Sequence, residues 1–297
     1  MRKLVFCLFL FGFIFSGCKK KPEAPPTPPD EDLQVVIVFS TQSQSVSLLK
    51  SGATEAEEKI DKIILFGVDD QSNVVAYPAI TGSQLTEALG GGMKLTISKK
   101  VKSLYAIANP SVALENATPA NVTALMDLRG VFGTAPASPF LMGGKGDINN
   151  SSANIQLIRA VAKIEITGNN DFDIKMVTVQ NTPNQGFVFK QTTFSVPSSF
   201  GRTNYATVTS ATPILYVAES PGGNPATFLV TGVFDGIQAS YLITIQVDGV
   251  PVDIVRNTHY QVGVTPITES EYDVTIAIPD WMDRKTDDHE IPYEDFN

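Results

Sequence analysis

Short apolar runs follow one another from residue 33 almost to the end of the chain, and they constrain the fold more than any other feature. Most alternate with a period of two, or stay apolar over five to eight residues, as β-strands do. Glycine and proline punctuate the chain between the runs. The expected strands cover 33–40, 62–69, 92–98, 103–110, 159–168, 174–182, 213–219, 226–235, 239–248, 259–267 and 272–281.

This pattern predicts an all-β protein made of two tandem β-sandwich domains with little helix. Within 159–166 and 259–267 the alternation predicts core strands, in which Val161, Ile164, Tyr260 and Val262 are buried. Residues 236–238 are expected to form a hairpin loop.

Only two segments favour a helix, 54–62 and 118–130. In the second, Thr118 is expected to cap the helix, Pro119 suits its first position, and Gly130 ends it.

The long polar segment TAPASPFLMGGKGDINNSSAN (134–154) is the expected divide between two halves of the 297-residue chain. The predicted organisation is a signal peptide over 1–17 and a spacer over 18–32. The spacer is followed by an N-terminal sandwich over 33–152 and then by a C-terminal sandwich over 153–297, which ends in an acidic tail.

The first residues resemble a lipoprotein export signal. Arg2 and Lys3 precede the apolar run LVFCLFLFGFIF, which is too short to span a bilayer, and the run ends in Ser-Gly-Cys at Cys18. Small residues before a cysteine indicate acylation of Cys18, although Phe15 stands where leucine is commoner. A plain secretory leader with an incidental cysteine is the alternative.

The proline-rich stretch after Cys18 predicts an extended spacer between a membrane and the folded protein. The chain has two cysteines, Cys7 and Cys18. Removal of the leader therefore leaves no possible disulfide within the mature fold.

Charge and motif spacing exclude several functions. The net charge of −9 argues against nucleic acid as a partner. His259 and His289 share no catalytic or metal-binding spacing, so the sequence predicts no catalytic residue, no metal and no cofactor. The GGKG and GGGMK stretches lack the spacing of a phosphate loop and favour hairpin turns. Asn- and Asp-rich segments at 146–154 and 168–173 favour tight turns over calcium sites.

Four separated blocks, taken in order, resemble the fimbrillin family of Bacteroidetes, the major subunits of type V pili. They are ATEAEEKIDKIILFGVDD, VKSLYAIANP, IRAVAKIEI, and VRNTHYQVGVTPI followed by Asp280 and Trp281. The resemblance implies two transthyretin-like β-sandwiches. It also implies export as an outer-membrane lipoprotein and cell adhesion as part of a fimbrium.

The resemblance further implies that a surface protease cuts after a basic residue that follows the first strand. Lys50 holds that place, before Ser51, where the family usually has arginine, and an Arg-specific protease discriminates between the two side chains. The first strand then leaves with its lipid, and a neighbouring subunit donates a strand from its C-terminal region. The candidate donor side chains are Ile276, Ile278, Ile291, Tyr293 and Phe296.

The residues themselves support the removable strand, because 33–40 carries apolar side chains on both faces, as an interior strand does. Its removal would expose unpaired backbone groups and an apolar trench. Three alternatives stay open: a permanently lipid-anchored glycan-binding lipoprotein, an uncut monomeric lipoprotein, and a secreted hydrolase.

Overall fold

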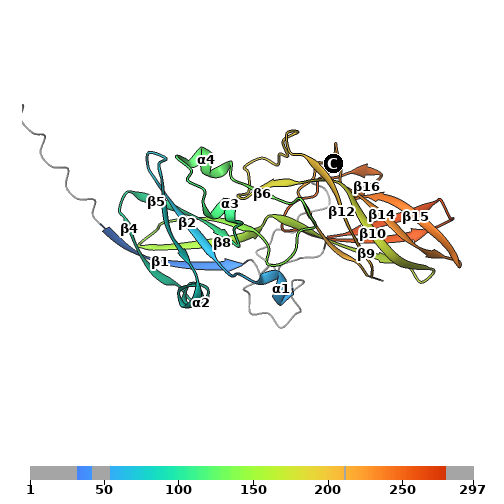
Figure 1. The fold of residues 1–297 in the computed structure, drawn as a ribbon, viewed down its shortest axis with the longest axis horizontal. Coiled ribbons are helices and arrows are strands. Elements are labelled where there is room, and N and C mark those ends of the chain that lie inside the picture. Colours follow the sequence, from blue (N-terminus) through green and yellow to red (C-terminus); the bar gives the residue numbers. More distant parts are fainter. Residues whose placement is uncertain (1–31, 42–53, 211, 279–297) are drawn as a thin grey trace, which may run out of the picture.

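A computed structural model of the chain describes residues 32–41, 54–210 and 212–278. Two β-rich lobes lie end to end in Figure 1. The first lobe contains the seven-stranded sheet that ends in sequence with β8, and the second lobe contains the two four-stranded sheets formed by later strands. The expectation of an all-β fold is confirmed.

One seven-stranded sheet, in the order β3-β2-β5-β7-β8-β1-β4, makes up the first lobe. Ile80 of β3 and Ile97 of β4 come from opposite edges of this sheet and share one core, so the sheet curls around that core. Its strands are β1 (Asp32–Thr41), β2 (Ile63–Asp69), β3 (Val74–Ile80), β4 (Met93–Ser98), β5 (Val101–Ala108), β7 (Met142–Asp147) and β8 (Ser152–Arg159).

The second lobe is a sandwich of two four-stranded sheets, β12-β10-β14-β15 and β13-β9-β18-β19, with a separate apolar core between them. Ile164, Tyr260 and Val262 are buried in this core, and Val161 is buried in the core of the first lobe, so all four are buried as predicted. The strands are β9 (Val161–Gly168), β10 (Phe172–Pro183), β12 (Arg202–Val208), β13 (Ile214–Ala218), β14 (Thr227–Phe234), β15 (Ile237–Thr244), β18 (His259–Pro266) and β19 (Tyr272–Ala277).

The described helices are short, and they cover the first lobe. Leu114 and Leu125, from two of them, pack with Val188 and Phe189 on the outer face of β2 and β5. The sheet is therefore buried on both faces at these two strands. The helices are α1 (Glu55–Glu58), α2 (Gly82–Gly90), α3 (Val112–Glu115) and α4 (Val122–Met126).

Two small strand pairs complete the fold. β6 (Arg129–Val131) pairs with β11 (Gln185–Phe187), and β16 (Gln246–Val247) pairs with β17 (Val250–Pro251). Because β11 follows β10 of the second lobe and pairs beside the first, the chain crosses between the lobes three times: before β9, before β11 and before β12.

The opening strands of the two lobes have equivalent neighbours. β1 lies between antiparallel β4 and parallel β8, and β9 lies between antiparallel β13 and parallel β18. Each lobe thus holds its first strand in the interior of a sheet.

Each predicted strand overlaps a strand of the structure, but the expected divide at 134–154 does not consist of loop. It contains β7, and β8 begins within it and extends the first sheet to Arg159. The GGKG stretch belongs to β7 and is not a hairpin turn. Three positions in this strand require glycine, because a Cβ there would lie 2.3–2.4 Å from a carbonyl oxygen of a neighbouring segment. They are Gly143, Gly144 and Gly146.

Three smaller expectations were also wrong. Arg159 ends β8 and does not begin the next strand, because the chain passes between sheets at Ala160. Asn121, not Thr118, caps α4, since its side-chain oxygen accepts from the Ala124 amide at 2.9 Å. The hairpin turn before β15 is formed by Asp235 and Gly236, both with positive φ.

Candidate functional site

The interior position of β1 is the first functional feature. Its residues pair with β4 from Asp32↔Ser98 to Ile37↔Met93, and with β8 from Val36↔Ser152 to Thr41↔Leu157. The expectation of an interior strand is confirmed. Removal of β1 would leave unpaired backbone groups on both neighbouring strands.

The inner face of β1 supplies part of the first lobe's core. Val35, Ile37 and Phe39 are each completely buried. Burial of each such side chain is worth about 1.5–3 kcal/mol. A sheet without β1 would therefore expose an apolar trench as well as backbone groups.

β4 depends on β1 for its place in the sheet. It is an edge strand of the described sheet, and β1 is its neighbour there. The turn that leads into β4 also lies against β1, because a Cβ on Gly92 would be 2.9 Å from Val36 Cγ1. Loss of β1 would thus leave β4 without its ladder partner.

Most residues predicted to act in processing and polymerisation lie outside the described part of the chain: Cys18, Lys50, Ser51, Ile291, Tyr293 and Phe296. The structure does place two of the candidate donor residues. Ile276, on edge strand β19, packs partly buried against the second core, and Ile278 is exposed.

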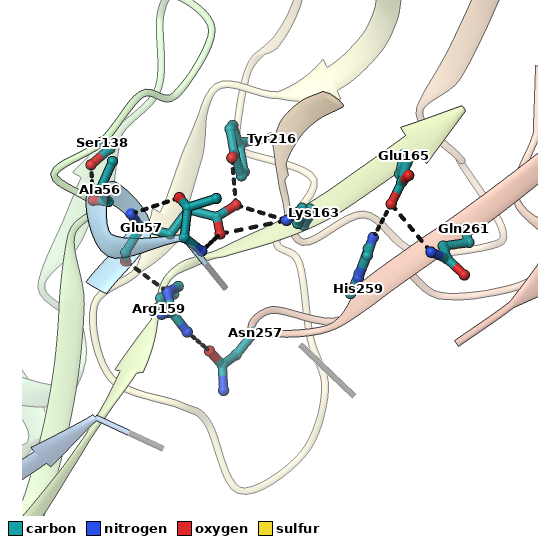
Figure 2. A network of polar contacts seen from close by, with 11 residues as sticks. Ala56, Glu57, Ser138, Arg159, Lys163, Glu165, Tyr216, Asn257, His259 and Gln261 are labelled. Atoms are coloured by element: carbon teal, nitrogen blue, oxygen red, sulfur yellow. Dashed lines mark hydrogen bonds and ion pairs between the residues drawn. The ribbon is translucent and has the colours of Figure 1, made fainter. Parts of the chain in front are cut away.

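The chain on either side of residues 42–53 meets the boundary between the lobes. β1 ends opposite Leu157, near the end of β8, and α1 begins after Thr54. Figure 2 shows α1 beside the start of β9, at the point where the first lobe passes into the second. We call this region the lobe junction.

Glu57 of α1 is the centre of a buried polar cluster at the junction (Figure 2). Its carboxylate accepts hydrogen bonds from the Tyr216 hydroxyl at 2.5 Å and from Lys163 Nζ, which is 3.0 Å from Oε1. Its carbonyl oxygen accepts from Arg159 Nε at 3.0 Å, and Arg159 in turn donates to Asn257 Oδ1 at 3.3 Å. We call these five residues the Glu57 network.

Thr54 and Glu57 also close a capping box at the start of α1. The Thr54 amide donates to Glu57 Oε2 at 2.5 Å, and the Glu57 amide donates to the Thr54 hydroxyl at 3.3 Å. Such a box satisfies two backbone donors at a helix N-terminus. The same carboxylate therefore starts the helix and docks it on the second lobe.

The Glu57 carboxyl is held ionised. Burial alone would raise its pKa, but hydrogen bonds from Tyr216, the Thr54 amide and Lys163, together with the Lys163 charge, lower the pKa below its ordinary value. Burial lowers the pKa of Arg159, against the opposing attraction of Glu57. Burial, with Glu57 as the hydrogen-bond acceptor, raises the pKa of Tyr216.

A second pair lies beside this network. His259 Nε2 is 2.9 Å from a carboxylate oxygen of Glu165, which also accepts from Gln261 (Figure 2). Burial and the nearby Lys163 charge lower the pKa of His259, although Glu165 acts in the opposite direction. Burial prevails, because the His259 ring is 6% exposed whereas the Glu165 side chain is 22% exposed and its charge is partly screened by solvent. His259 is thus a structural residue of the junction.

Two further residues tie the junction together. Asn109, which follows β5, donates to the carbonyl oxygens of Lys59 at 2.9 Å and Phe140 at 2.8 Å. Buried Arg256 donates to the carbonyl oxygens of Phe187 and Val188 and pairs with Glu219 at 2.6 Å. Arg256 therefore attaches Phe187 and Val188, at the end of β11, to the second lobe.

The blocks of sequence that carry the fimbrillin resemblance meet at this junction. Their contributions are Glu57 from the first block, Asn109 from the second, Arg159 and Lys163 from the third, and Arg256, Asn257 and His259 from the fourth. Sequence reasoning quoted these blocks but did not single out their polar residues. The available signal was in the third block, where Arg159 and Lys163 interrupt an otherwise apolar run.

No group of His, Cys, Asp and Glu side chains that could hold a metal ion occurs within the described ranges. None of the helices in these ranges is long and apolar enough to cross a membrane.

Solved structures of fimbrial and adhesion proteins have the same fold as this chain. The tip fimbrial protein Mfa3 of Porphyromonas gingivalis, in a C-terminally truncated form, superimposes with a TM-score of 0.58 at 14% identity. The match covers 84% of this chain and 100% of the Mfa3 chain. This chain therefore has a fimbrillin-like fold, and the resemblance expected from its sequence is confirmed at the level of the fold.

A second structure, a candidate cell adhesion protein of Parabacteroides distasonis, gives a TM-score of 0.55 at 13% identity. That match covers 85% of this chain and 98% of the other. By sequence the chain matches no family model and no curated protein. The likeness is thus one of architecture.

Proposed function

We propose that this chain is a structural or adhesive subunit of a type V pilus. It is exported as a lipoprotein on Cys18, reaches the cell surface, and polymerises by donor-strand exchange after β1 is removed. The subunit has no enzymatic role, and its partners are other pilus subunits, a processing protease and, through the lipid, the outer membrane.

The interior position of β1 is the observation that carries the proposal. β1 combines three properties: it is the first strand of the fold, it lies between two other strands, and its inner face is completely buried. A strand with these properties leaves a specific, apolar groove when it departs. Recognition by strand addition uses such a groove, with main-chain hydrogen bonds for affinity and side-chain pockets for specificity.

The exit of the chain from β19 supports a role for the C-terminal region. Ala277, the last residue of β19, lies opposite Gln261, near the start of β18 and therefore close to the junction. Nineteen residues follow Ile278 in the 297-residue sequence. Extended at about 3.3 Å per residue, they would reach roughly 60 Å, enough to leave the subunit and fill a ten-residue groove.

A reversible staple across β1 and β4 tests the exchange. Gln34 and Thr96 are exposed and directly opposite each other in the antiparallel pair. In the double variant Gln34→Cys/Thr96→Cys, oxidation would hold β1 in the sheet even after the chain has been cut. We expect oxidised cells to lack fibres in electron micrographs, and reduction to restore them.

Each single cysteine variant serves as the control, because it carries a thiol but cannot form the staple. The mechanism is wrong if the oxidised double variant forms fibres of normal length. If cells with and without the gene carry identical fibres, the pilus role itself is wrong, and the lipid-anchored glycan-binding alternative becomes the better account.

A further inference from the structure

Helix α1 cannot hold its position by its own stability. It has four residues, a single turn, and an isolated helix of that length is not stable in water. Its capping box satisfies two amides at the N-terminus, but it does not attach the helix to the protein. The contacts of α1 with the rest of the fold must therefore decide where this segment stays.

Those contacts lead mainly to the second lobe. Within the described chain, the Glu57 carboxylate bonds to Thr54 of its own capping box, to Lys163 of β9 and to Tyr216 of β13. None of these partners lies on β1 or on its neighbour β4. The carbonyl oxygen of Glu57 does accept from Arg159, the last residue of β8, but Arg159 lies beyond the β1–β8 ladder, which ends at Thr41↔Leu157. No bond of the Glu57 carboxylate therefore leads to the ladder that holds β1.

Apart from Arg159, the first lobe contributes contacts from uncharged side chains in the same region. Ser138 donates to the carbonyl oxygen of Ala56, and the Phe140 ring packs on the Tyr216 ring at 4.5 Å. Asn109 accepts from the Asp61 amide at 2.8 Å. These partners follow β5 or precede β7, and none of these hydrogen bonds leads to β1.

Burial makes the ionic contact costly to break. The side chains of Glu57 and Lys163 are 2% and 5% exposed. Detachment of α1 would deprive Lys163 of this carboxylate in a site from which water is excluded, and breaking one side of a buried ion pair is strongly unfavourable.

We propose that Glu57 anchors the chain to the second lobe, so that strand exchange releases β1 but leaves α1 and everything after it docked. This inference rests on the proposed function, in which β1 departs. It assigns Glu57, Lys163 and Tyr216 the role of positioning residues, which keep α1 attached to the second lobe when β1 departs.

Amide hydrogen exchange on the intact full-length chain, followed over a series of low denaturant concentrations, tests the anchor. In the wild type we expect β1 and β4 amides to exchange through one opening, and the Glu57–Lys59 amides through another with a different denaturant dependence. If β1 and α1 amides share one opening, with equal rates and equal denaturant dependence, Glu57 does not separate them and the proposal is wrong.

The variant Glu57→Gln removes the charge and keeps the shape. We expect the α1 amides to exchange faster by a factor on the order of 10², while β1 amides keep their wild-type rates. Glu55→Gln is the matched control, because it makes the same change at an exposed position of the same helix. Wild-type exchange of α1 in Glu57→Gln would overturn the proposal.

Tyr216→Phe covers the case in which Glu57→Gln does not fold. It removes one hydroxyl from the carboxylate and should accelerate exchange at α1 by about tenfold without change at β1. Equal acceleration at both sites would count against the anchor. Because the measurement uses uncut protein, it is independent of fibre formation, whereas the cysteine staple tests fibre formation alone.

Discussion

Gly144 of β7 faces the main chain of β8 so closely that a Cβ on Gly144 would lie 2.3 Å from the carbonyl oxygen of Gln156. The atom in the way belongs to the backbone, so it cannot turn aside as a flexible side chain would. β7 and β8 link the part of the sheet that contains β2 and β5 to the part that contains β1. This contact therefore supports the wall of the groove that β1 occupies.

Substitution Gly144→Ala should lower the free energy of unfolding by roughly 3 kcal/mol, because β7 and β8 must move apart. Denaturant titration would measure the change. Gly133→Ala is the control, since nothing lies within 4 Å of a Cβ there, and it should change stability by no more than about 0.5 kcal/mol. Equal effects of the two substitutions would contradict the close contact.

Substitution of Asn109 should lower the stability of the protein for two separable reasons. Its φ is +53°, a conformation that favours glycine or asparagine, and its amide bonds to Lys59, Asp61 and Phe140. Asn109→Gly loses the hydrogen bonds, whereas Asn109→Ala also strains the backbone. Thermal and chemical denaturation should show alanine to be less stable than glycine by about 1 kcal/mol. The reverse order would refute the backbone assignment.

Acid should weaken the fold partly through Glu57. Its pKa is lowered in the folded protein, so its contribution to stability is complete above the ordinary value of 4.5 and is lost as the pH falls through the folded pKa. Stability measured between about pH 5 and pH 3 should therefore fall less steeply in Glu57→Gln than in the wild type. Glu55→Gln should keep the wild-type slope; a wild-type slope in Glu57→Gln would be the contrary result.

His259 should add a second pH dependence at higher pH. Its pKa is lowered on folding from 6.5, so the unfolded chain takes up this proton first as the pH falls. Stability should decline from about pH 6.5 downward until the folded pKa is reached, and His259→Gln should remove that decline. An NMR titration of the His259 ring that gave a folded pKa above 6.5 would reverse the sign and reject the prediction.

Processing at Lys50 predicts the start of the mature chain. Mass spectrometry of subunits from sheared fibres should find Ser51 at the N-terminus, and Lys50→Gln should abolish both that terminus and the fibres. Lys59→Gln is the control, since Lys59 is an exposed lysine that forms a surface ion pair with Asp61. Normal fibres made of Lys50→Gln subunits would show that cleavage there is not required.

The sequence predicted most of the strands with strong alternation, because a buried face and an exposed face impose a period of two. It missed β8, which alternates as clearly but overlaps the segment expected to be a divide. It did not predict β7, since its glycines serve close packing between backbones and carry no apolar pattern. It also missed β3, in which Pro78 suggests a break but is tolerated in an edge strand.

The Glu57 network was beyond sequence reasoning for a different reason. Glu57 lies among Glu55 and Glu58 in a polar stretch, and although the Thr54–Glu57 spacing fits a capping box, that spacing gives no sign that the glutamate is buried. Its partners lie more than a hundred residues away along the chain. Long-range pairing of this kind becomes visible only when the fold brings β9 and β13 next to α1.

The parallel pairing of β1 with β8 has a consequence for the order of folding. Val36 lies opposite Ser152, so one ladder of β1 cannot form until a segment more than a hundred residues later is available. Contacts of such high sequence separation form slowly, because a long loop must close first. A nascent chain that emerges from its N-terminus would therefore expose Val35, Ile37 and Phe39 until residue 157 has followed. During that interval the strand that the proposed exchange would remove also needs protection from premature pairing with another copy.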